Sequence, residues 1–202
     1  MKETRIYLLR HAETATPHVF HGAESDVELG TRGIEQAEAA AEYLSCKGVT
    51  RTCSSAMRRA LQTAEPISRS CNTSVEVIPL LHERKVGPLS GTCNQKKEGI
   101  WPDTLMEWKK GNIKYAPEGS ESLACMQDRV FPVWNSLLQR HSGETIVVVC
   151  HGMVIKVLLL GILPGWDVSR WDEFGPVPNI GITEMVFSEQ QYKVIELNKV
   201  PS

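Results

Sequence analysis

The sequence lacks an apolar run long enough to cross a membrane, and it lacks an excess of charge of either sign. Its longest apolar stretch is MVIKVLLLGILPG, which Lys156 interrupts and which is shorter than the roughly 20 residues of a membrane-spanning helix. The 22 basic and 24 acidic residues nearly cancel, so no overall field attracts nucleic acid or an anionic membrane. The first residues also lack the charged and then apolar pattern of a secretory leader. We therefore expect a soluble, cytoplasmic protein without nucleic-acid or membrane partners.

Paired cysteines and the common phosphate-binding loops are missing as well. The six cysteines form no CxxC pair, and a chain of 202 residues can build a core without disulfides, so reduced thiols are expected. Neither GxGxxG nor GxxxxGK[ST] occurs, and no cluster of carboxylates favours magnesium. His18 and His21 have the HxxH spacing of metal ligands, but Pro17 and Gly22 favour a loop and no third ligand is evident. We expect no metal and no cofactor, so any bound phosphate must be held by side chains.

Short aliphatic and β-branched runs alternate with helix-length segments along the chain. The runs predict strands at residues 5–9, 49–53, 75–79 and 145–150. The segments predict helices at residues 31–47, 57–69 and 120–141 and directly after Gly152, with Pro132 kinking or breaking the third. Strands that alternate with helices imply crossover connections, and therefore a mostly parallel sheet with helices on both faces.

The last part of the sequence follows a different pattern. Residues 179–197 predict two strands joined by a short turn near Glu189, which form an antiparallel hairpin at one edge of the sheet. The fold class expected is α/β, a three-layer α/β/α sandwich with a mostly parallel central sheet and one antiparallel edge strand, in a single domain over residues 1–202. Residues 87–117, rich in glycine and proline, are the least regular part, and we expect them to cover the active site.

Polar residues follow each of the four predicted strands. In an open α/β sheet, ligands bind beyond the carboxyl ends of the strands, where helix N-termini point their N–H groups into the crevice. The four strand ends carry Arg10 and His11, Ser54 and Ser55 with Arg58 and Arg59, His82 and Glu83, and His151 and Gly152. Two histidines, several arginines and a carboxylate around a helix N-terminus make a cationic pocket that suits a dianion such as a phosphoryl group.

A histidine in such a pocket can act as a nucleophile. A neutral imidazole nitrogen attacks phosphorus near pH 7, and neighbouring guanidinium groups neutralise charge on the transferring group. Arg10 and Arg59 also disfavour a second positive charge, so they should keep His11 neutral and reactive. Arg58 is explained equally well as part of a solvated helix face. Glu13 either orients the arginines or caps the loop after the first strand.

Four motifs, in order, resemble those of the histidine phosphatase superfamily, also called the phosphoglycerate mutase-like family. They are LLRHAET, SSAMRRALQTAE, LHERKVGPLSG and VVVCHGMVIKVLL, and they lie between residues 5 and 160. The resemblance implies that His11 is the phosphorylated nucleophile and that Glu83 is the proton donor. The phosphate clamp that it implies consists of Arg10, Arg59 and the second catalytic histidine, His151. Gly152 is expected to bind substrate as well, because the start of the helix after it suits an anion. The implied reaction requires no metal.

The same resemblance leaves two activities open. Relatives that act as cofactor-dependent phosphoglycerate mutases carry a long insertion between the glutamate and the second histidine, whereas only 67 residues separate Glu83 from His151 here. This spacing favours the phosphatase branch, in which a metal-independent phosphatase hydrolyses small-molecule phosphate monoesters through a phosphohistidine intermediate. The mutase is the alternative, because ERKVG, which includes Arg84, resembles its ERxYG segment. A binding module without activity is disfavoured because His11 and Glu83 are both present.

The natural substrate stays open among α-ribazole phosphate, phosphoglycerate, a sugar phosphate and other esters. TRGIEQA resembles α-ribazole phosphatases, and YAPEGSES resembles broad-specificity members. The residues expected to line the leaving-group side are His18, Phe20, His21, Trp101, Trp108 and Tyr115. Their moderately apolar character indicates a small organic monoester. The tryptophans at 134, 166 and 171 are predicted to be packing residues. A homodimer is expected only from its general frequency among proteins.

Overall fold

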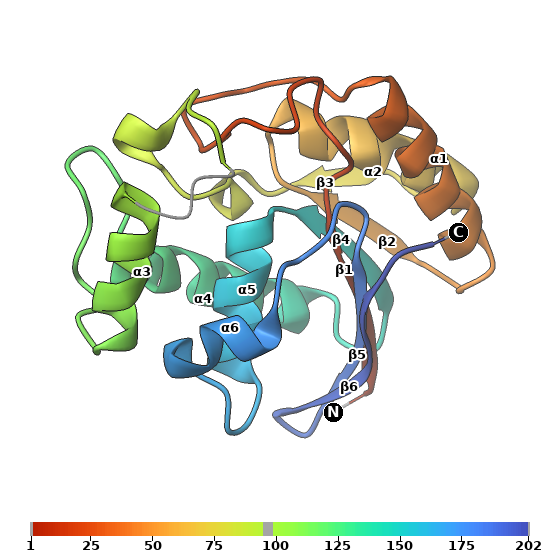
Figure 1. Ribbon diagram of the computed structural model, residues 1–202. Helices are drawn as coiled ribbons and strands as arrows, with labels where there is room; N and C mark the ends of the chain where they lie inside the picture. Colours follow the sequence, from red (N-terminus) through yellow and green to blue (C-terminus); the bar gives the residue numbers. More distant parts are fainter. Residues whose placement is uncertain (1, 95–98, 202) are drawn as a thin grey trace.

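The computed structural model describes residues 2–94 and 99–201, and a six-stranded sheet forms the centre of this part of the chain (Figure 1). The strands are β1 (Thr4–Arg10), β2 (Arg51–Ser54), β3 (Val75–Val77), β4 (Thr145–Cys150), β5 (Ile182–Ser188) and β6 (Gln191–Lys199). Their order is β3-β2-β4-β1-β5-β6. The first four strands pair in parallel, β5 pairs antiparallel with β1, and β6 pairs antiparallel with β5. The predicted mostly parallel sheet is confirmed, and β5, which runs against the other strands, lies one position inside the edge strand β6.

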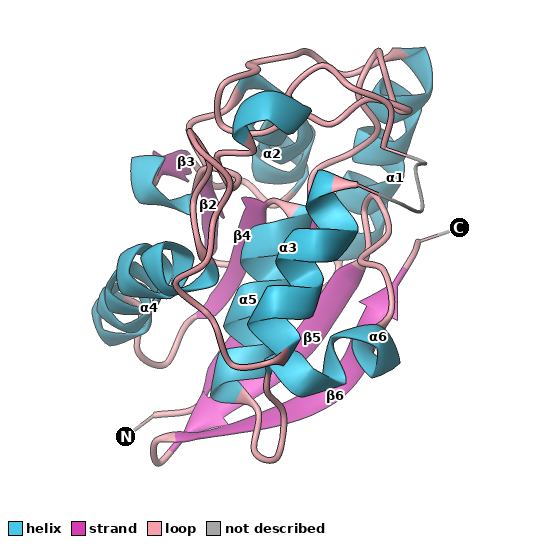
Figure 2. Ribbon diagram, turned by 60° about the vertical axis from the view of Figure 1, so that its left-hand side comes forward, coloured by secondary structure: helices cyan, strands magenta, loops and turns pink. Residues whose placement is uncertain are grey.

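Helices cover both faces of this sheet and make the predicted three layers (Figure 2). They are α1 (Thr31–Ser45), α2 (Arg58–Ser70), α3 (Ile100–Lys109), α4 (Leu123–Arg140), α5 (Gly152–Ile162) and α6 (Trp171–Phe174). Successive strand residues point to opposite faces, so Ile6 and Leu8 pack with α4 and α5, whereas Tyr7 and Leu9 pack with α1 and α2. Because the central strands are buried on both faces, their sequences are nearly continuous apolar runs. Within the described ranges, no helix is both long and apolar enough to span a membrane.

The segment predicted to be least regular, residues 87–117, contains helix α3. Pro102 lies in the first turn of α3, where a backbone N–H has no intrahelical partner, so this proline does not oppose the helix. Trp108 is completely buried in the core, and its Nε1 donates a hydrogen bond to the carbonyl of Tyr115 at 2.8 Å. The expectation of irregular structure is therefore wrong for residues 100–109. Residues 95–98 of that segment lie outside the described residues.

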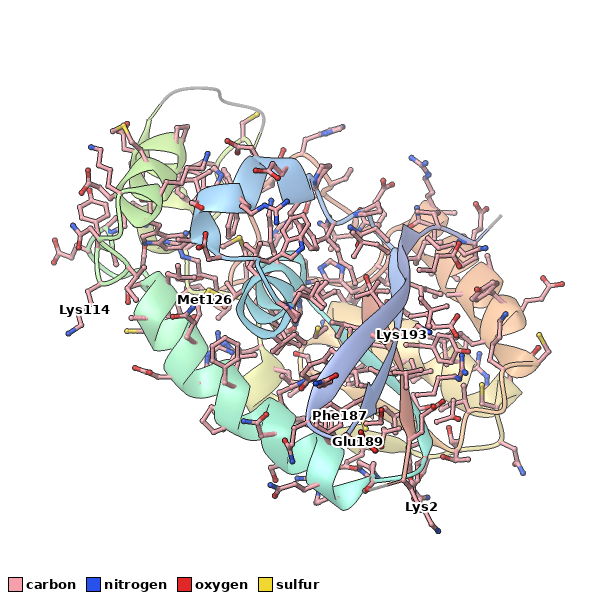
Figure 3. The ribbon with its side chains drawn as sticks, turned by 90° about the horizontal axis from the view of Figure 1, so that it is seen from below. Lys2, Lys114, Met126, Phe187, Glu189 and Lys193 are labelled. Atoms are coloured by element: carbon pink, nitrogen blue, oxygen red, sulfur yellow. The ribbon has the colours of Figure 1, made fainter. Side chains whose placement is uncertain are left out.

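The hairpin predicted near the end of the chain is confirmed. Glu189 and Gln190 connect β5 to β6 with φ angles of 50° and 63°, and such two-residue turns match the twist of the flanking strands. The turn lies beside Phe187 at the tip of the hairpin (Figure 3). The Phe187 and Tyr192 rings pack across the two strands with centroids 4.7 Å apart. Trp134 of α4 donates a hydrogen bond to the Tyr192 hydroxyl at 2.9 Å, which ties the edge of the sheet to that helix.

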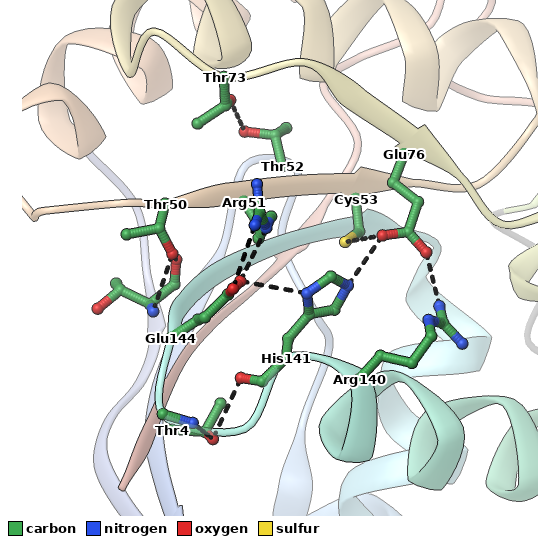
Figure 4. A network of polar contacts seen from close by, with 12 residues as sticks. Thr4, Thr50, Arg51, Thr52, Cys53, Thr73, Glu76, Arg140, His141 and Glu144 are labelled. Carbon is green, nitrogen blue, oxygen red and sulfur yellow. Dashed lines mark hydrogen bonds and ion pairs between the residues drawn. The ribbon is translucent and has the colours of Figure 1, made fainter. Parts of the chain in front are cut away.

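A polar network joins the end of α4 to the sheet (Figure 4). The helix continues through its internal proline to Arg140, which donates to Glu76 of β3 at 2.6 Å. The two ring nitrogens of His141 lie 2.8 Å from Glu76 Oε2 and 3.2 Å from Glu144 Oε2. Burial raises the pKa of the neighbouring Cys53 thiol to about 12, so this thiol stays protonated. The network borders the start of β4, at the end of the sheet opposite to the predicted site.

Candidate active site

The carboxyl ends of β1 and β4 border a cavity of about 290 Å³. The predicted site residues that line it are Arg10, His11, Glu83 and Gly152. The other two, Arg59 and His151, are completely buried and lie outside the lining. The ring centroids of His11 and His151 are nevertheless only 5.2 Å apart in an edge-to-face arrangement. The structure thus brings together side chains that are far apart in the sequence, as the strand-end argument predicts.

Backbone contacts fix the position of His11 at the end of β1. Its N–H donates to the Cys150 carbonyl at 2.9 Å, which continues the pairing with β4. Its own carbonyl accepts a hydrogen bond from Asn179 Nδ2 at 2.9 Å. The N–H of Ala12 donates to Thr63 Oγ1 at 3.0 Å, so helix α2 also holds this turn. The chain beside the predicted nucleophile is therefore anchored from three elements or loops.

The ring of His11 has a defined proton position. Its Nδ1 lies 2.7 Å from the carbonyl oxygen of Ala12, and because a carbonyl only accepts, Nδ1 must carry the hydrogen. Burial lowers the pKa of His11 well below its usual range, and the charges of Arg10 and Arg59 lower it further. The ring is therefore neutral at pH 7, with an unprotonated Nε2. This is the form of imidazole that acts as a nucleophile.

His151 makes a hydrogen bond with Ser55 through its Nε2. Its Nε2 lies 2.8 Å from Ser55 Oγ, and that oxygen also accepts the N–H of Met57 at 3.3 Å. Because a hydroxyl oxygen can accept two hydrogen bonds and donate one, this contact fits either Ser55 donating to Nε2 or an Nε2–H donating to Ser55. Nδ1 is completely buried and has no partner among the described residues. Burial, followed by the charge of Arg59, lowers the pKa of His151 well below its usual range.

Arg10 lies between the loop before β5 and the N-terminus of α5. Its Nη1 donates to the Val177 carbonyl at 2.6 Å, while its buried Nε has no partner in the described part of the chain. A Cβ built on Gly152 would lie 3.4 Å from that Nε. The absence of a side chain at Gly152 therefore leaves the guanidinium and the first N–H groups of α5 facing the same space, which is the arrangement of an anion site.

Arg59 is placed differently from the prediction. Its Nη1 donates to the Ser25 carbonyl at 2.8 Å, and its Nη2 lies 3.3 Å from the carbonyls of His21 and Gly22. Arg59 therefore holds the loop of residues 21–25 and acts on the site mainly through its charge, which lowers the pKa of His11. Its buried Nε has no partner among residues 2–94 and 99–201. The choice of Arg59 over Arg58 agrees with burial, since Arg58 is exposed and ion-paired at the surface.

Glu83 connects the third strand end to the helix after β4. Its Oε1 accepts the N–H of Arg84 at 2.8 Å, and its Oε2 accepts the N–H of Met153 at 3.3 Å. The second contact places the carboxyl group at the N-terminus of α5. Because Glu83 also lines the cavity, it is positioned to exchange a proton with a ligand bound there.

The remaining lining differs in part from the prediction. Phe20 and His21 line the cavity as expected, but Trp101 and Trp108 belong to α3 and are not part of the lining. Trp171, predicted to be a packing residue, is buried and also lines the cavity. The cavity residues that sequence reasoning missed include Lys156, Asn94 and Asn179. The sequence contains one signal for this part of the lining. Lys156 interrupts an apolar helix and lies four residues after Gly152, which places both residues on the same face of the helix.

The two buried neutral histidines should make stability depend on pH. Unfolded histidines take up protons below about pH 6.5, whereas His11 and His151 stay neutral until pH reaches their lowered pKa values. Between these limits the unfolded state binds more protons, so the free energy of unfolding should fall as pH falls, by up to about 1.4 kcal/mol per pH unit for each histidine. Urea unfolding of the wild type and of His11→Gln between pH 7 and 5.5 measures this. The variant should lose about one histidine's share of the slope, and an unchanged slope would refute the assignment.

Known proteins resemble this chain over most of its length. A glucosyl-3-phosphoglycerate phosphatase of Mycolicibacterium vanbaalenii is 29% identical over 187 residues, which cover 89% of this chain and 82% of that protein. A metal-independent phosphoserine phosphatase of Arabidopsis thaliana is 33% identical over an alignment of 210 positions, which covers 91% of this chain and 87% of that protein. A phosphoserine phosphatase of Entamoeba histolytica, solved in complex with 3-phosphoglyceric acid, superposes with a TM-score of 0.82 at 25% identity and 97% coverage of both chains. The model of the histidine phosphatase superfamily (branch 1) matches residues 6–200, and the chain therefore belongs to this superfamily.

Proposed function

We propose that this protein is a metal-independent phosphatase that hydrolyses small-molecule phosphate monoesters through a phosphohistidine at His11. The observation that carries the proposal is a group of buried nitrogens that have no partner among the described residues, namely Arg10 Nε, Arg59 Nε and His151 Nδ1. A buried polar atom without a partner costs about 1–3 kcal/mol. A phosphoryl group offers several acceptor oxygens and negative charge, which suit the arginine N–H donors.

In the first proposed step, His11 Nε2 attacks the phosphorus atom. A P–N bond forms as the P–O bond to the alcohol breaks, and Glu83 gives its proton to the leaving oxygen. Charge on the transferring group is stabilised by Arg10, by the N–H groups at the start of α5, and by the field of Arg59. The neutral state of His11 supports this step, since its lone pair is available at pH 7.

In the second proposed step, water hydrolyses the phosphohistidine. Glu83 is now a carboxylate and takes a proton from the water molecule, whose oxygen bonds to phosphorus as the P–N bond breaks. Inorganic phosphate leaves, and both His11 and Glu83 return to their starting forms. No step needs a metal ion, in keeping with the similarity to a metal-independent phosphoserine phosphatase. The six free cysteines suit a reducing compartment, which supports the expected cytoplasmic location.

Hydrolysis of p-nitrophenyl phosphate in the presence of EDTA tests the proposal. We expect full activity with the chelator and inhibition by vanadate, which copies the five-coordinate phosphorus of the transition state. Activity that disappears with EDTA and returns with a divalent cation would refute metal independence. The mutase alternative is tested with 3-phosphoglycerate and a bisphosphate primer. We expect release of inorganic phosphate, and formation of 2-phosphoglycerate without phosphate release would favour the mutase.

A further inference from the structure

Lys156 lies on the same face of α5 as Gly152, one turn further along the helix. Residues four apart are neighbours on a helix surface, and both line the cavity. Four residues correspond to a rise of about 6 Å along the helix axis. A ligand whose phosphoryl group sits at the N-terminus of α5 can therefore bring a second group, a few bonds away, to Lys156.

The ammonium of Lys156 is held in place by the segment after α6. Its Nζ donates to the Gly175 carbonyl at 2.8 Å and lies 4.2 Å from the centre of the Trp171 ring. Two residues further along, the carbonyl of Val177 accepts from Arg10. One short stretch of backbone thus positions both cations of the lining, Arg10 at the phosphate end and Lys156 beyond it.

No carboxylate within the described ranges forms an ion pair with Lys156. Asp172, whose charge raises the pKa of Lys156, is ion-paired with Lys109. The lysine side chain is only 7% exposed, and burial lowers its pKa to about 8, so it is still mainly charged at pH 7. The hydrogen bond to Gly175 uses one of its three N–H donors. A buried cation that has spare donors, and no ion-pair partner in the described part of the chain, is a binding point for an anionic group.

We infer that Lys156 binds a carboxylate on the alcohol part of the substrate, so that the enzyme selects carboxylated phosphate monoesters over their neutral counterparts. This inference rests on the proposed function for the position of the phosphate. Trp171 and the Gly175 carbonyl hold the ammonium in one place, which reduces the entropy cost of binding the carboxylate. The selected ligand has a phosphate and a carboxylate separated by a short carbon chain.

A matched pair of esters tests the inference. 3-Phosphoglycerate and glycerol 3-phosphate differ chiefly in that the first has a carboxylate where the second has a hydroxymethyl group. Their dissociation constants are measured by calorimetry on His11→Gln protein, in which the esters are not consumed. We expect 3-phosphoglycerate to bind more tightly, and Lys156→Met to lower the ratio of the two affinities by about tenfold or more. Lys156→Arg keeps the charge and should retain most of the preference.

Lys110→Met is the control, because Lys110 lies outside the cavity lining and is ion-paired with Glu107 rather than with Asp172. It should leave the affinity ratio unchanged. Equal weakening of both esters by Lys156→Met would show that this lysine only supports the fold, and an absence of preference in the parent protein would also overturn the inference. The binding measurement does not depend on turnover. If wild-type protein fails to hydrolyse p-nitrophenyl phosphate, the proposed function fails, while the affinity ratio still decides the role of Lys156.

Discussion

His11→Gln should lower kcat/KM for p-nitrophenyl phosphate on the order of 10⁴-fold or more, because it removes the only proposed nucleophile. Glutamine keeps a polar side chain of similar length but cannot form the P–N bond. The loss should appear in kcat, since Arg10 and the N-terminus of α5 still bind the phosphate. Steady-state kinetics measure the loss of kcat, and vanadate binding shows that the variant still binds a phosphate analogue.

His141→Gln is the matched control for this prediction. His141 lies in the network at the start of β4, at the other end of the sheet from the cavity. Its replacement should reduce stability while the folded protein keeps its activity. A residual activity of His11→Gln within tenfold of the wild type, in protein shown to be folded, would mean that another group attacks phosphorus.

Glu83→Gln should lower kcat by about 10²- to 10⁴-fold for an alkyl phosphate, because it removes the proposed proton donor. The loss should be much smaller for formation of the phosphohistidine from p-nitrophenyl phosphate, since p-nitrophenolate is a stable leaving group that needs no proton. Single-turnover measurements with both esters separate this step from hydrolysis of the intermediate.

Glu13→Gln supplies the control for Glu83, because Glu13 is a second carboxylate in the cavity lining. Glu13 is ion-paired with Arg32 at 3.5 Å and has no proposed role in proton transfer. The Glu13→Gln variant should show the same ratio of rates for the two esters as the wild type. Equal losses for both esters in Glu83→Gln would indicate that the carboxylate mainly holds the N–H groups of Arg84 and Met153 in place.

The strand ends could be predicted from the sequence because short apolar runs and the polar residues after them are local features. Once β1 and β4 are parallel neighbours, their carboxyl ends must adjoin, and this alone brings His11 close to His151. The order of strands and helices is also a local feature, because short apolar runs alternate with helix-length segments along the chain. The hairpin was equally local, since two turn residues between β-branched runs suffice to indicate it.

The direction of long side chains could not be predicted in the same way. Nothing near Arg59 in the sequence indicates that its guanidinium binds carbonyls of residues 21–25, because that contact depends on how a distant loop folds over α2. Trp171 could be recognised as apolar but not as part of the cavity wall. The helix containing Trp108 was missed because glycine and proline near its start conceal its period.

Trapping the phosphorylated enzyme tests the central claim most directly. Wild-type protein is mixed with substrate carrying radioactive phosphate, quenched in base within a single turnover, digested, and examined by mass spectrometry. The account predicts a protein-bound phosphate on Nε2 of His11 that is lost in acid, survives in base, and forms at least as fast as kcat. Release of inorganic phosphate with no labelled protein at any time, or a label on a residue other than His11, would contradict it.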